Sequence, residues 1–85
     1  MSIRQFENIR PDIAASAWVD DTALVIGDVS LAEDVSLRPL VVARGDVNTI
    51  AVGARTNIQD GTIMHVSPDS EFAPGGFPLS IGADV

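Results

Sequence analysis

Aliphatic residues recur at every sixth position through the middle of the chain. One column contains Val19, Val25, Leu31, Leu37 and Ala43. A second column, four residues further along each unit, contains Ala23, Val29, Val35, Val41 and Val47. Six is not a helical period, and in one flat strand it would mark only every third inward position. A fixed short period is typical of a solenoid, in which each unit buries its apolar side by stacking on the next.

The positions between these columns carry Asp, Glu, Gly, Ala and Pro, which favour turns. Each unit is therefore interpreted as a very short strand followed by a corner. The register slips by three residues after Asn48 and resumes at Val52, which predicts a bulge or small loop near 48–50. An antiparallel sandwich with a hairpin turn at Asp60-Gly61 is the alternative, but it would show strict period-two alternation over longer runs.

The pattern divides the chain into a lead-in over residues 1–16 and a partial solenoid domain over residues 17–85. A proline-rich segment with a Gly-Gly pair predicts a loop at about 67–78. The repeat returns at Ile81, and the sequence ends at Val85 on an inward position of a new unit. Because neither a capping helix nor a polar terminal repeat is recognisable, we expect the N-terminal part of a longer protein, without its C-terminal coils and capping helix.

The aromatic residues outside the repeat have predicted structural roles. Trp18 is expected to cover the apolar end of the first coil. Phe72 and Phe77 are expected to pin the long loop to the body of the domain.

Composition and charge narrow the classes of function. The chain has 85 residues, of which 46% are hydrophobic, and this supports one globular domain with a modest core. Five Arg against 12 Asp and Glu give a net charge of −7, which argues against a nucleic-acid partner. Cysteine is absent, no signal peptide is recognisable, and the longest apolar run is too short to cross a bilayer. We expect a soluble cytoplasmic protein with no membrane partner.

An aliphatic residue followed four positions later by a small residue resembles the hexapeptide repeat of the left-handed parallel β-helix. The fold class this predicts is all-β, with about three triangular coils of three hexapeptides each. Residues 25–85 also resemble the γ-class carbonic anhydrases. The resemblance rests on these segments: Ala43-Arg44-Gly45-Asp46, Gly53 to Gly61, Met64-His65-Val66, and Pro74 to Leu79. It covers about three quarters of this chain and about the first half of a typical family member.

The resemblance implies that His65, the only histidine, is a zinc ligand. Catalytic zinc takes three protein ligands and a water, whose pKa it lowers to about 7. The resulting hydroxide would convert carbon dioxide to bicarbonate. In the family, two further histidines follow later in the sequence, and one of the three ligands comes from a neighbouring subunit of a trimer. This chain therefore carries an incomplete ligand set, for zinc or for iron or cobalt as alternative metals.

The same resemblance implies roles for two amides and three charged residues. Gln59 matches a residue that orients the metal-bound water, and Asn57 matches one that binds substrate or supports the site. The alternative is that both amides stabilise turns. Arg44, Asp46 and Asp60 match a charged network at the family's subunit interface. The alternative is that they are unrelated surface charges, since exposed pairs contribute only about 0–1 kcal/mol.

Counting the units gives an independent geometric prediction. Arg44 and His65 each follow an inward residue, and they lie three units apart across the register slip. They should therefore occupy the same face of adjacent coils, about 4.8 Å apart along the axis. Gln59 should lie one face earlier.

Three functions are compatible with the sequence. The first is zinc-dependent, reversible hydration of carbon dioxide by a homotrimer, or by this chain completed by a complementary C-terminal fragment. The second is a hexapeptide-repeat acyltransferase that uses a histidine as general base. The third is a non-catalytic, trimeric assembly or binding subunit. For the 85 residues alone we expect no hydration activity.

Overall fold

The computed structural model describes residues 1–85 as a β-structure with no helix, so no helix is present that could cross a membrane. Nine strands follow one another along the chain. They are β1 (Ser2–Arg4), β2 (Asp12–Ile13), β3 (Trp18–Val19), β4 (Leu24–Leu31), β5 (Ser36–Leu37), β6 (Val42–Val52), β7 (Asn57–Ile58), β8 (Ile63–His65) and β9 (Leu79–Ile81).

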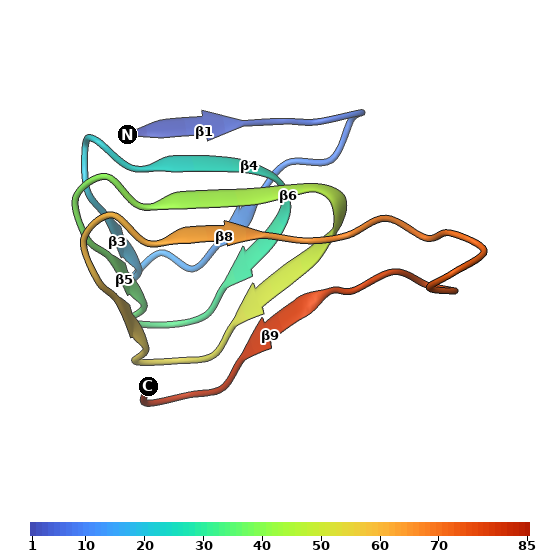
Figure 1. Ribbon diagram of the computed structural model, residues 1–85. Coiled ribbons are helices and arrows are strands. Elements are labelled where there is room, and N and C mark those ends of the chain that lie inside the picture. The colour runs from blue at the N-terminus through green and yellow to red at the C-terminus, as the bar shows by residue number, and fades with distance from the viewer.

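The strands wind into a three-sided solenoid in which neighbouring strands are parallel (Figure 1). The first face holds β1, β8 and the first halves of β4 and β6. The second face holds β2, β9 and the second halves of β4 and β6. The third face holds β3, β5 and β7. The chain therefore completes three coils and adds the first two faces of a fourth, which confirms the predicted left-handed parallel β-helix.

The core consists of the two predicted aliphatic columns except Val47, and it continues through the later units. Along β4, inward residues are buried and alternate with outward ones, as a strand with one face on the core requires. Val25, Val35, Leu37 and Ala43 are fully buried, and each packs on its equivalents in the coils above and below. The six-residue period therefore arises because three short strands per coil each return an aliphatic residue to the same axis.

The register slip is confirmed, but one inward assignment was wrong. Gly27 pairs with Gly45, whereas the next aligned pair is Val29 with Ile50, so β6 holds three extra residues at this corner. Ile50 is 1% exposed and fills the place beneath Val29, while Val47 is 47% exposed. The extra residues form a bulge that turns Val47 outward, and period alone could not tell which of the two residues faces the core.

The lead-in residues form most of the first coil. β1 and β2 both pair with β4, and between them Phe6 and Ile9 form a small antiparallel bridge. Glu7 and Asn8 at the tip of this hairpin have positive φ, as tight hairpin turns require. A domain boundary near residue 16 stays a prediction.

The predicted loop leaves the body between β8 and β9, and Ser67 and Phe77 bridge its base (Figure 1). Phe72 is 92% exposed and Phe77 is 66% exposed, so the prediction that they pin the loop was wrong. Trp18 also points outward, and the Arg38 guanidinium lies 5.0 Å from the centre of its ring. Trp18 precedes the buried Val19 in β3, so strand alternation turns its ring outward, whereas Phe72 and Phe77 lie in the loop between β8 and β9.

Candidate functional site

His65 and Arg44 lie side by side on the first face of the solenoid. They are direct partners in the parallel register of β6 and β8, which confirms the prediction made by counting units. Both follow a buried residue, Met64 and Ala43 respectively, so both side chains point outward. His65 is exposed. The strand geometry thus presents an imidazole and a guanidinium on adjacent rungs about 4.8 Å apart.

Only two of the three predicted interface charges meet within the chain. Arg44 Nη1 lies 3.5 Å from Asp46 Oδ2, and the two residues share the outward side of β6. This pair is partly exposed, so it contributes little to folding stability. Asp60 lies in the turn between β7 and β8, is exposed, and forms no ion pair within the chain. Its carboxylate is therefore available at the surface.

The two predicted catalytic amides lie around the corner from His65. Asn57 stands on β7, on the third face, where its Oδ1 accepts a hydrogen bond of 2.8 Å from the Ser36 hydroxyl. Gln59 follows β7 directly, and its main-chain carbonyl accepts a hydrogen bond from Thr62 in the turn. One chain therefore places His65 and the amides on two neighbouring faces that meet at the turn over residues 59–62.

An apolar column lies beside His65 and was not predicted from the sequence. Leu24, Val42 and Ile63 are aligned partners on the outward side of β4, β6 and β8. Ile26 extends this surface next to Arg44. Ile63 is 65% exposed, and the other three are half-buried. The sequence signal for this column was that Leu24 and Ile26, on both sides of the inward Val25, are also apolar. A strand whose outer face meets only solvent would carry polar residues there.

Asn48 is a second residue that sequence reasoning did not single out. It lies within the bulge of β6, and its Nδ2 donates to the carbonyl oxygens of Ser67 and Gly75 at 3.0 and 2.9 Å. Its Oδ1 accepts a hydrogen bond from the Thr49 amide. Asn48 therefore joins the bulge of one coil to the loop of the next. Its position inside the register slip was the only sequence signal.

One cleft lies beside Asp46, and His65 is not part of it. It has a volume of about 420 Å³, and its lining includes Phe6, Ile9, Val47 and three carboxylate residues. His65, Asn57 and Gln59 do not line it. The predicted site is thus an exposed surface within one chain.

The donor set for a metal is incomplete within these residues. No group of three His, Cys, Asp or Glu side chains is close enough to hold a metal ion. His65 offers one imidazole nitrogen, and the neighbouring Arg44 is a cation and no ligand. The 85 residues therefore fit zinc only as the contributor of a single ligand.

Comparisons with known proteins agree with this fold and repeat. No family model matches the sequence. Protein YrdA of Escherichia coli (strain K12) is 51% identical over 83 residues, which are 98% of this chain and 45% of that protein. A carbonic anhydrase of Geobacillus kaustophilus is 41% identical over 68 residues, 80% of this chain and 37% of that enzyme. A hexapeptide transferase family protein from Anaplasma phagocytophilum superposes with a TM-score of 0.83 at 30% identity, covering 96% of this chain and 43% of its own.

The fold and its six-residue unit define a hexapeptide-repeat left-handed β-helix protein. The chain belongs to the γ-class carbonic anhydrase-like family of these proteins. It spans about half the length of the curated relatives that it matches.

Proposed function

We propose that this chain carries one part of a zinc site for the reversible hydration of carbon dioxide, formed where subunits of a homotrimer meet. The observation that carries the proposal is the exposed His65 beside Arg44 on an apolar face. The similarity to a carbonic anhydrase supports it. We expect the remaining ligands from outside these 85 residues, because the chain contains no other histidine and no group of three His, Cys, Asp or Glu side chains lies close enough to hold a metal.

The apolar column supports an assembly in which the first face is covered. Leu24, Val42 and Ile63 form a continuous outward stripe on which a neighbouring subunit can pack. If the turn over residues 59–62 lies near the three-fold axis, the first face of one subunit meets the third face of the next. That arrangement would bring Asn57 and Gln59 of one copy towards His65 of another.

Each residue then has a defined role at the junction. His65 binds the metal, which when bound supplies a hydroxide near neutral pH. Gln59 accepts or donates a hydrogen bond that orients the water, and Asn57, held by Ser36, supports the substrate side. Arg44, Asp46 and Asp60 form the charged network between subunits, where Asp60 supplies a carboxylate that is unpaired within one chain.

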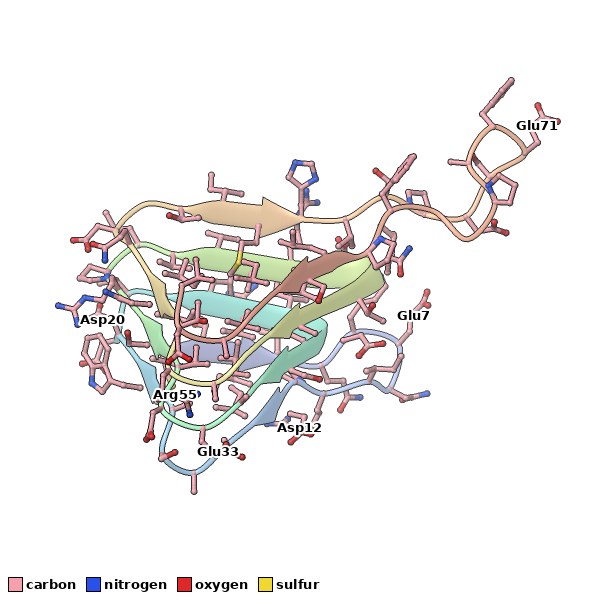
Figure 2. The ribbon with its side chains drawn as sticks, turned by 90° about the horizontal axis from the view of Figure 1, so that it is seen from below. Glu7, Asp12, Asp20, Glu33, Arg55 and Glu71 are labelled. Carbon is pink, nitrogen blue, oxygen red and sulfur yellow. The ribbon has the colours of Figure 1, made fainter.

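Metal content and hydration together test this proposal. We expect the 85-residue protein alone to show no zinc-dependent hydration by stopped-flow measurement, since it supplies one ligand. A version extended with the part of Protein YrdA outside the match should bind zinc, measured by elemental analysis. His65→Ala should abolish that zinc, whereas Glu71→Gln, at the loop tip far from the body (Figure 2), should retain it. Zinc retained by the His65→Ala variant would overturn the proposal.

Acyl transfer is the second candidate. It is supported by the similarity to a hexapeptide transferase family protein. His65 would then act as a general base on an acceptor hydroxyl or amine, without a metal. Turnover of acyl-CoA that persists in EDTA and is lost in His65→Ala would favour this function. A trimer with neither activity would favour the non-catalytic assembly subunit.

The cellular location proposed here is the cytoplasm, on the sequence features alone. No nucleic-acid partner is proposed, because a net charge of −7 opposes binding to phosphates.

A further inference from the structure

A cleft lies at the corner between the first and second faces of the solenoid. The hairpin between β1 and β2 and the loop between β8 and β9 leave the body on the same side (Figure 1). Phe6 and Ile9 of the hairpin, Val47 of the β6 bulge and Pro68 of the loop all line the cleft. Its volume of about 420 Å³ is within the range of small-molecule sites.

The apolar wall of this cleft lies outside the core. Phe6, Ile9 and Val47 are 37%, 47% and 47% exposed, and none of them is among the core residues or the half-buried residues that pack on the core. The bulge of β6 turns Val47 outward, and bulges often occur beside sites because they redirect a side chain. Apolar side chains that gather around a cleft without joining the core are typical of a binding surface.

The walls of the cleft are held in place by close main-chain packing and by one amide. A Cβ at position 45 would lie 2.6 Å from the Asp28 carbonyl oxygen, so Gly45 allows β4 and β6 to approach closely at this corner. Asn48 Nδ2 donates to the carbonyl oxygens of Ser67 and Gly75, which ties the loop to the bulge. The cleft is therefore formed before a ligand arrives, and this reduces the entropic cost of binding.

Three carboxylates line the same cleft, and only one of them has a cation beside it. Asp46 lies 3.5 Å from Arg44, and its side chain is 20% exposed. Asp28 is half-buried, Glu7 lies at the tip of the hairpin (Figure 2), and neither takes part in an ion pair. These charges repel anions, and the net charge of −7 adds to that repulsion. The cleft is therefore complementary to a cation.

An organic cation fits this arrangement better than a metal ion does. No group of three His, Cys, Asp or Glu side chains lies close enough to hold one metal ion. Glu7, Asp28 and Asp46 come from successive coils, which are separated by about 4.8 Å each. An ammonium or guanidinium group pairs with one or two carboxylates and leaves its attached chain or ring to cover the apolar wall.

We propose that this cleft binds a small organic cation, a protonated amine or guanidinium carried on a short apolar chain or ring. The positive group pairs with Asp28 and lies towards Asp46, while the apolar part contacts Ile9 and Val47. Because the hairpin and the loop border the cleft, a free molecule enters it more readily than a side chain fixed on a protein surface. The proposal needs no zinc and no residue outside these 85.

Titration of the isotope-labelled 85-residue protein in EDTA, followed by NMR, tests the proposal. The probe is phenethylamine, and phenylpropionate is the control, with the same ring, a similar length and the opposite charge. Phenethylamine should cause saturable shifts of the Phe6, Val47 and Asn48 amide resonances and leave that of Ile81 unchanged. Phenylpropionate should bind at least about tenfold more weakly, because it brings a carboxylate against Asp28.

Matched variants locate the site. Asp28→Asn should weaken phenethylamine binding about tenfold, and Val47→Ser should weaken it by a smaller factor. Glu71→Gln changes the net charge equally but lies at the loop tip (Figure 2), so it should bind as the parent does. Glu7→Gln, at an exposed turn, applies the same test if Asp28→Asn does not fold.

Four outcomes would overturn the proposal. They are the absence of saturable shifts, equal affinity for phenethylamine and phenylpropionate, equal weakening by Asp28→Asn and Glu71→Gln, and a short arginine peptide that binds more tightly than phenethylamine. The last outcome would show that the cleft takes a protein side chain instead of a small molecule.

Discussion

Two corners of the same solenoid differ in how much variation they accept. The corner between the third and first faces has the same length in every coil, over residues 20–23, 38–41 and 59–62. The corner between the first and second faces ranges from a continuous bend in β4, through a bulge in β6, to the loop over residues 66–78. The first is called here the constant corner and the second the variable corner.

The difference follows from what each corner contributes to the core. The constant corner carries Ala23 and Val41, which are buried at 1% and 0% exposure, so an insertion there would displace a core column. It is also tied across coils, since the Thr22 hydroxyl accepts from the Leu40 amide. Extra residues at the variable corner bulge outward and return to the same register, as Ile50 does beneath Val29. A corner can therefore vary in length only where the added residues bulge outward and the inward column keeps its register.

The largest effect should come from the inward column itself. Leu37→Ala removes a fully buried side chain from the strand just before the constant corner, and should lower the free energy of unfolding by about 2–5 kcal/mol. Phe72→Ala, at the tip of the variable corner, should change it by less than about 0.5 kcal/mol. Urea unfolding followed by circular dichroism compares the two. Equal losses would show that the loop packs on the core after all.

A smaller, local effect on stability is expected when the contact between the bulge of β6 and the loop over residues 66–78 is removed. Asn48→Ala deletes the two hydrogen bonds to the loop, each contributing about 0.5–1.5 kcal/mol, together with the local one from the Thr49 amide. Hydrogen exchange should speed up at residues 67–77 and stay unchanged at Val25 and Ala43. Gln5→Ala, at an exposed position of the hairpin, is the control and should alter neither region. Faster exchange throughout the coils would mean that the loop is part of the global folding unit.

The smallest effect concerns the ion pair between Arg55 and Asp84, which is called here the charged corner, and it depends on pH. The hydrogen bond from Arg55, with its positive charge, holds the pKa of the Asp84 carboxyl below its usual value. Because the folded-state pKa is the lower one, this stabilisation is complete above the unfolded-state pKa of about 4 and disappears as the pH falls through the folded-state value. The stability difference between the parent and Asp84→Asn should be constant above about pH 5 and shrink below about pH 4.

Glu71→Gln is the control for the charged corner, since Glu71 makes no ion pair. High salt should reduce the Asp84 difference at neutral pH, because both partners of the pair are largely exposed. A stability difference between the parent and Asp84→Asn that increases as the pH falls would contradict the lowered pKa of Asp84.

Most of the coil architecture was predictable because it depends on a local period. Val25, Leu31 and Leu37 repeat six residues apart, and only a three-sided coil brings all of them to one axis. The same period aligned Arg44 with His65. The inward residue at the bulge could not be predicted in the same way. Val47 and Ile50 are both aliphatic, and either could continue the inward column.

Contacts between distant segments were not predictable in the same way. Asn48 reaches the loop near residue 75, and the hydroxyl of buried Thr56 donates to the carbonyl of Gly82. Trp18 was predicted to cover the apolar end of the first coil, yet its ring lies on the outer surface beside Arg38. These outcomes depend on which segments the coils stack together, and the sequence pattern carries no direct record of that.

The six-residue column alone was enough to determine a three-sided parallel solenoid and the outward direction of His65, because side-chain alternation and the coil period are local properties of the chain. Folding in three dimensions decided the rest. It decided that Ile50 rather than Val47 fills the core at the bulge, joined Asn48 to the loop near residue 75, and placed apolar side chains on the outer surface beside His65. Each of these depends on how coils pack on one another, a relation that exists only once the chain has closed its turns.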